Sequence, residues 1–157
     1  MKAILKKDLW SITSFLENKN HKFDKKKILG NLPESFIDDA IKSISSWKTY
    51  EPTPLIRLNK LNNELKFNEI YYKDEDKRFD LKSFKALGGA FAVYKIANEK
   101  KDITVATATA GNHGRSVAWG AQRLGLKCKI FISENVSESR AEAMRNLDAE
   151  VIRVKGN

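Results

Sequence analysis

A lysine at position 85 stands in the apolar, glycine-bearing stretch FDLKSFKALGGA. Ser83 predicts the start of a helix, and Lys85 falls in its first turn, between Phe84 and Ala86. The positive end of a helix and apolar neighbours both disfavour the charged ammonium form of a lysine. A lysine that loses its proton easily is a nucleophile toward carbonyl groups and can form a Schiff base. A simpler alternative stays open, in which Lys85 only extends its charged end to water from an amphipathic helix.

A second stretch, TATAGNHG, lies where α/β proteins bind ligands. It follows a short β-branched segment, Ile103–Thr109, that is typical of a buried parallel strand, and it leads into a helix predicted over Arg115–Leu124. Gly111 and Gly114 permit a tight turn and close approach of the backbone to a ligand. Asn112 can both donate and accept a hydrogen bond. Glycine and asparagine could also be there for conformational reasons alone.

The elements that must position these motifs alternate regularly from residue 84 onward. Helices are predicted at 84–99, 115–124 and about 140–147, and strands at 103–109, 127–132 and 150–154. This order is typical of α/β proteins with a short parallel sheet, flanking helices and right-handed crossovers. Residues 1–75 are less regular, with a helix around 32–47, a loop at 50–55 and a strand at 69–73. Because the sequence halts directly after a strand and leaves an open sheet, we expect it to be the front part of a longer protein.

The amino-acid composition limits the classes of function that this chain can have. With 41% hydrophobic and 31% charged residues, the 157-residue chain is typical of globular proteins, and no run reaches the roughly 18 apolar residues of a membrane span. One cysteine and two histidines exclude a Cys/His metal cage, and the single cysteine favours a cytoplasmic setting. The net charge of +9 is concentrated in eight lysines at 1–27 without an arginine cluster. This indicates a lysine-rich solvated surface rather than a nucleic-acid site.

The two motifs in this order resemble pyridoxal-phosphate enzymes of fold type II, the tryptophan-synthase-β and threonine-dehydratase type. Within that group, RFDLKSFKALGGAFAVYK followed by TATAGNHGRSVAWGAQRLG is most similar to diaminopropionate ammonia-lyase. The segments PTPL, YKDE and SESR also fit, so the resemblance covers roughly residues 50–157. It implies that residues 1–80 belong to the larger cofactor domain and that 81–157 form a smaller α/β domain carrying both motifs. The implied reaction is α,β-elimination of 2,3-diaminopropionate to pyruvate and ammonia.

The resemblance also implies a role for each matched residue. Lys85 is expected to bind pyridoxal phosphate through a Schiff base and to move protons at the substrate α-carbon. Phe84 is expected to pack against the cofactor ring, and Asn112 to hydrogen-bond the 3′-oxygen of that ring. His113 is interpreted as a positioning residue rather than an acid or base. The loop that receives the substrate carboxylate would consist of Thr107, Thr109, Gly111, His113 and Gly114.

One position departs from the family pattern. Diaminopropionate ammonia-lyases usually read TATDGNHG, with an aspartate that acts as an acid or base toward one substrate enantiomer, and Ala110 stands there in this chain. A methyl group cannot move a proton, so activity on that enantiomer is in doubt. Elimination from another amino acid, as in threonine and serine dehydratases, stays an alternative.

The family's glycine-rich phosphate loop and the residue that meets the pyridine nitrogen have no counterpart in these 157 residues. We therefore expect an N-terminal fragment that binds pyridoxal phosphate weakly and is inactive unless a separately encoded C-terminal half completes it. A small amino-acid substrate and a homodimer are the other partners implied, with no nucleic acid and no membrane. The alternative is a non-catalytic interaction or regulatory module.

Overall fold

The computed structural model describes residues 24–65, 68–100 and 102–156, arranged in two compact units. The described residues of unit 1 fall within Met1–Ile37 and Pro54–Asp74, and those of unit 2 fall within Asp38–Thr53 and Glu75–Asn157. Most of the lysine-rich N-terminal segment lies outside the described residues. The domain boundary expected at residue 80 stays a prediction. Within the described ranges, no helix is both long and apolar enough to cross a bilayer.

Unit 1 contains short elements. An antiparallel pair joins β1 (Leu55–Arg57) to β2 (Tyr71–Lys73), with α3 (Asn59–Leu65) between them in sequence. The helix α1 (Lys25–Asn31) begins at Asp24, whose carboxylate accepts a hydrogen bond from the amide of Lys27. The predicted helix around 32–47 is α2 (Glu34–Ser45), which runs from unit 1 into unit 2.

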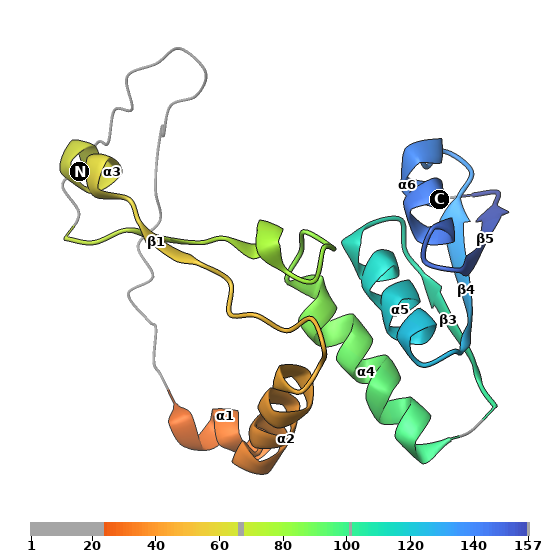
Figure 1. Ribbon diagram of the computed structural model, residues 1–157, viewed down its shortest axis with the longest axis horizontal. Helices are drawn as coiled ribbons and strands as arrows, with labels where there is room; N and C mark the ends of the chain where they lie inside the picture. The colour runs from red at the N-terminus through yellow and green to blue at the C-terminus, as the bar shows by residue number, and fades with distance from the viewer. Residues whose placement is uncertain (1–23, 66–67, 101, 157) are drawn as a thin grey trace. The chain divides into compact units, whose positions relative to one another are not determined.

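Unit 2 is built on a parallel sheet of order β3-β4-β5, which Figure 1 shows with its covering helices. The strands are β3 (Thr104–Ala108), β4 (Lys127–Ser133) and β5 (Ala149–Val154), and they are connected through α5 (Asn112–Arg123) and α6 (Glu138–Arg145). Alternate residues of β4 enter one apolar core with both helices, so α5 and α6 lie on the same face of the sheet. That core includes Cys128, Ile130, Ile132, Val117, Ala118, Ala141 and Met144. The fold class predicted from the sequence is confirmed.

The helix α4 (Lys85–Glu99) packs along α5, because small residues let the two backbones approach. A Cβ added at Gly120 of α5 would lie 2.8 Å from the Cα of Ala90 on α4. Only glycine at this crossing leaves room for the neighbouring backbone. Because α4 packs on α5 and α5 packs on the sheet, this contact between the two helices sets the position of the lysine motif relative to the sheet.

Aromatic side chains hold the segment that precedes the lysine. The ring of Phe79 lies 5.6 Å from that of Trp47 and 4.8 Å from that of Trp119, measured between centroids. The guanidinium of Arg123 lies 4.7 Å from the Trp47 ring and 4.6 Å from the Trp119 ring. These contacts tie the chain before α4 to α5.

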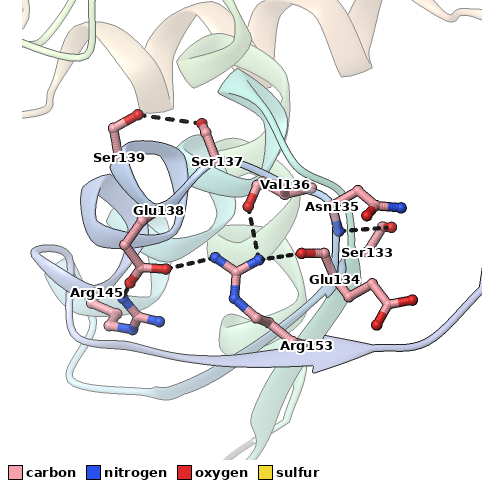
Figure 2. A network of polar contacts seen from close by, with 9 residues as sticks. All are labelled: Ser133, Glu134, Asn135, Val136, Ser137, Glu138, Ser139, Arg145 and Arg153. Carbon is pink, nitrogen blue, oxygen red and sulfur yellow. Dashed lines mark hydrogen bonds and ion pairs between the residues drawn. The ribbon is translucent and has the colours of Figure 1, made fainter.

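An arginine of β5 organises the loop between β4 and α6, as Figure 2 shows. Arg153 donates hydrogen bonds to the carbonyls of Glu134 and Val136, at 3.0 and 2.8 Å, and to the carboxylate of Glu138. Arg145 pairs with the other oxygen of Glu138. The loop lies at the carboxyl ends of the parallel strands, the edge at which the segment after β3 also turns.

Candidate functional site

Lys85 is the first residue of α4, one residue after the predicted start of the helix. Its amide donates a hydrogen bond to the hydroxyl oxygen of Ser83 at 3.2 Å, so Ser83 does support the helix start. The lysine and Phe84 are both exposed, with 57% of Phe84 accessible, and the Nζ atom lies 5.0 Å from the centre of the Phe84 ring. The apolar enclosure that the sequence suggested for Lys85 is therefore not present among the described residues.

Ser116 joins the lysine motif to the Gly-Asn-His-Gly motif. Its hydroxyl is fully buried, donates to the carbonyl of Lys85 at 2.7 Å and accepts from the amide of Ala90 at 3.1 Å. Both partners lie on α4, whereas Ser116 follows the second motif on α5. A Cβ at Gly89 would lie 2.5 Å from the Ser116 hydroxyl and 3.5 Å from Nδ1 of His113. The first turns of α4 and α5 are thus neighbours, and the structure brings the two motifs together.

The helix α5 begins at Asn112, three residues earlier than predicted, with Gly111 as its N-cap. The extended backbone of Gly111, at φ −131° and ψ −152°, ends the turn, so Asn112, His113 and Gly114 form the first helical turn instead of a loop. The first amides of a helix lack intrahelical acceptors and lie at its positive end. The motif thus gains backbone donors suited to an anion such as a carboxylate.

The two threonines of the motif differ in position. Thr107 lies within β3, paired with Ile130 of β4 and half-buried. Thr109 follows the strand and extends the ladder by donating its amide to the carbonyl of Phe131 at 3.1 Å. A Cβ at Gly114 would come within 3.2 Å of Thr109, so Thr109 packs directly against the helix start whereas Thr107 supports it from the sheet.

Sequence reasoning missed Ser116 and gave no role to Arg78. The buried guanidinium of Arg78 pairs with Glu75 at 2.9 Å and donates to the hydroxyl of Thr53 at 3.1 Å. The hydrogen bond with Glu75 raises the pKa of Arg78, with burial opposing it. Thr53 in turn donates to Glu75 at 2.6 Å. This network anchors the PTPL segment to the chain before the lysine. In the sequence, the only sign of it was an arginine directly before the apolar residue Phe79.

The site can hold a carbonyl cofactor. The Nζ atom of Lys85 forms no hydrogen bond or ion pair with any described residue, so its amine is available for a Schiff base. Apart from the chain neighbours and the helix's own backbone, no atom lies within 4 Å of a Cβ built at Gly88 or at Gly111, so each of these positions borders open space. The exposed ring of Phe84 and the exposed amide of Asn112 lie at the starts of the two neighbouring helices. The residues fit a flat, anionic aldehyde that uses a lysine.

Fold and site together define an α/β protein with a lysine at one helix start and a Gly-Asn-His-Gly helix start beside it. The family model of pyridoxal-phosphate dependent enzymes matches residues 47–157, and the chain belongs to this family. The family assignment confirms the fold type and, at the level of the family, pyridoxal phosphate as the cofactor.

Relatives and solved structures agree with this assignment. Diaminopropionate ammonia-lyase from Escherichia coli K12 is 40% identical over 121 residues, which cover 66% of this chain and 30% of the relative. Biosynthetic L-threonine dehydratase from Haemophilus influenzae is 34% identical over 131 residues, covering 81% of this chain and 25% of the relative. The holo selenomethionine structure of the Escherichia coli ammonia-lyase superposes with a TM-score of 0.74 at 36% identity, covering 79% of this chain and 36% of that one. This chain thus spans between a quarter and just over a third of the length of these proteins.

Proposed function

We propose that Lys85 holds pyridoxal phosphate and that the chain serves β-elimination from a small amino acid, with 2,3-diaminopropionate as substrate and pyruvate and ammonia as products. The observation that carries this proposal is the Ser116 bridge, which sets Lys85 beside the Gly-Asn-His-Gly helix start. The similarity to ammonia-lyases supports the choice of substrate. A second structure of the Escherichia coli enzyme contains an aminoacrylate intermediate, which is consistent with elimination in that relative.

Each side chain then has a distinct task. When bound, the cofactor supplies an electron sink for charge at the substrate α-carbon. The amine of Lys85 would hold the cofactor and would also be the group that moves the proton at that carbon. The ring of Phe84 and the amide of Asn112 are both exposed, and they would pack against the cofactor and hydrogen-bond its ring oxygen, respectively.

The substrate carboxylate is proposed to bind at the start of α5. The amides of the first turn supply donors, and the positive end of the helix favours the negative charge. His113 of α5 lies beside Gly89 of α4, where the two helices meet. We therefore assign His113 the role of orienting this turn and not that of carrying the proton. Thr109 and Gly111 form the chain that leads into the first turn of α5, and Gly114 lets the backbone of that turn lie close to Thr109.

Ala110 limits the substrates that the site can process. Its methyl group packs against the core of unit 2, so this position provides no proton carrier. We propose that elimination proceeds from one enantiomer of diaminopropionate only. The matches to threonine dehydratases support L-threonine or L-serine as the second candidate.

Completion by a second polypeptide segment is part of the proposal. The aligned region covers 30% of the ammonia-lyase and 25% of the threonine dehydratase. Each charge-assisted hydrogen bond to the cofactor phosphate is worth about 1.5–3 kcal/mol, so a chain without a phosphate loop binds the cofactor weakly. We propose that a C-terminal part supplies this loop, that the completed protein is a homodimer, and that it acts in the cytoplasm. A chain that never gains the cofactor would instead be a non-catalytic interaction module.

The test uses this chain with and without the C-terminal segment of Escherichia coli diaminopropionate ammonia-lyase that follows the aligned region. The co-expressed pair is expected to show the visible absorbance of lysine-bound pyridoxal phosphate, and borohydride reduction should place a pyridoxyl label on Lys85 in a peptide map. The variant Lys85→Ala should lose both signals. Lys82→Ala, an exposed lysine just before α4, should keep both. Absence of the label from Lys85 in the pair, with label elsewhere or nowhere, refutes the assignment of the lysine.

Substrate assays on the same pair test the finer proposal. Pyruvate release is measured with L- and D-diaminopropionate, L-serine and D-serine, and 2-oxobutanoate release with L-threonine. We expect one diaminopropionate enantiomer to react, and Ala110→Asp to add the other. Turnover of both enantiomers by the parent chain would contradict the role given to Ala110.

A further inference from the structure

A cleft of about 410 Å³ lies in unit 2 and contains none of the residues assigned to the cofactor site. Its walls come from the loop at 79–81, from one side of α5 and from the end of α6 with the residues after it. The volume is within the range of about 300–1,000 Å³ that is usual for small-molecule sites. Aromatic and aliphatic side chains form most of the wall, and two opposite charges, those of Arg115 and Asp80, stand in it.

Arg115 has hydrogen-bonding capacity that the described residues do not use. Its Nε atom is buried and has no hydrogen-bond partner. Within the described ranges, its side chain also takes part in no ion pair. A guanidinium is always charged and presents its donors as a planar fork that matches a carboxylate. The terminal nitrogens of the guanidinium are not among the fully buried atoms, so they, rather than Nε, are the donors that a carboxylate in the cleft would meet.

Asp80 reaches the same cleft from a strained loop. Phe79, Asp80 and Lys82 have φ values of 49°, 57° and 54°, in the left-handed region that residues other than glycine rarely adopt. The loop stays in this conformation because Phe79 is buried against Trp119. Such strain is typical of functional sites. Among the described residues, Asp80 has no ion-pair partner, neither Arg115 nor another cation.

We propose that this cleft binds a zwitterionic small molecule of the α-amino-acid class with an apolar side chain. Arg115 pairs with its carboxylate and Asp80 with its ammonium, while the apolar side chain packs against Trp119 and Leu147. A ligand that carries only one charge leaves either the guanidinium or the aspartate unmatched. The cleft is separate from Lys85, so occupancy of one site does not require the cofactor at the other.

L-leucine is the probe, and the readout is nuclear magnetic resonance of the ¹⁵N-labelled chain without cofactor. We expect saturable shifts of the Arg115 Nε–H and Trp119 indole signals. The single-charge analogues 4-methylpentanoate and isoamylamine should bind about tenfold more weakly or worse, because each loses one charge-assisted pair. Equal binding of 4-methylpentanoate, or no saturable shift with L-leucine, overturns the proposal.

Matched variants locate the site. Arg115→Gln and Asp80→Asn should each weaken L-leucine binding by about tenfold. Arg140→Gln, an exposed arginine of α6 outside the cleft, should not weaken binding. Asp102→Asn should not either, although Asp102 is exposed and left-handed like Asp80, with φ 55°. If Arg115→Gln fails to fold, the exposed Asp80 decides the outcome, and undiminished binding to Asp80→Asn refutes the proposal.

The variant Lys85→Ala separates this proposal from the proposed function. It should lose the cofactor label and keep L-leucine binding unchanged. Loss of L-leucine binding in Lys85→Ala would mean that the probe occupies the cofactor site, and the second site would be disproved.

Discussion

Replacing Gly120 by alanine tests whether the crossing of α4 and α5 is as close as the structure shows. The added Cβ would lie 2.8 Å from the Cα and 3.0 Å from the Cβ of Ala90. Ordinary carbon contacts are about 3.5–4.0 Å, so the helices must separate by about 1 Å. The nearest atom belongs to the backbone, so no side-chain rotation relieves the clash.

The magnitude follows from two opposing effects. Alanine is favoured over glycine within a helix by about 1 kcal/mol. Overpacking costs about 1–3 kcal/mol or more, and a backbone neighbour places this case at the upper end of that range. The net loss of unfolding free energy is therefore about 2 kcal/mol, which lowers Tm by about 4–8 °C in a chain of this size.

Gly88→Ala is the matched control. Gly88 also lies inside a helix of unit 2, but nothing stands within 4 Å of its Cβ position. It should gain the helix propensity without the clash and raise Tm by about 2–4 °C. Thermal unfolding followed by circular dichroism at 222 nm compares the two variants. Shifts of the same sign and size in both would show that the helices do not approach as described.

Three further expectations concern single side chains. Ser116→Ala removes two hydrogen bonds of a buried hydroxyl and should lower the free energy of unfolding by about 1–3 kcal/mol, measured by urea titration. Burial raises the pKa of the Cys128 thiol, so a disulfide reagent should label it slowly in the folded chain at pH 8 and rapidly in urea, and fast native labelling would contradict its burial. Hydrogen bonds from Arg145 and Arg153 lower the pKa of Glu138 below its ordinary 4.5. The stability that this carboxylate contributes is therefore present above pH 4.5 and lost as pH falls through its lower folded pKa, and Glu138→Gln should flatten that part of the acid-unfolding curve.

The order of elements from residue 84 onward was predictable because each is marked by its own periodicity and end signals. The strand at 103–109 is β-branched, and the helix after it stops at Gly125, whose φ is +65°. The start of α5 was predicted three residues late, since glycine in a strand-to-helix turn indicates a loop as readily as an N-cap. In unit 1, β1 and α3 were missed because elements of three and seven residues carry too little periodicity.

The contacts that make the site were less predictable than its residues. Lys85 and Asn112 are candidate site residues that motifs predict, but the Ser116 hydroxyl that joins their helices looks like any small residue of an amphipathic helix. The left-handed backbone of Phe79 was equally hidden, because a bulky residue normally avoids that conformation. Tertiary packing imposes both features, through the α4–α5 crossing and through the Trp119 ring.

The α4–α5 pair also separates what this chain supplies from what a complementing segment would supply. Ser116, Gly89, Ala90 and Gly120 belong to unit 2, so the lysine and the Gly-Asn-His-Gly turn keep their mutual position through contacts within that unit. A phosphate loop contributes hydrogen bonds to another part of the cofactor, and these determine how tightly it binds. A complementing segment should therefore change the concentration of pyridoxal phosphate needed for labelling and leave the labelled residue the same. At saturating cofactor the chain alone should carry the label on Lys85, and Ser116→Ala should reduce that selectivity because the first turn of α4 then loses its link to α5.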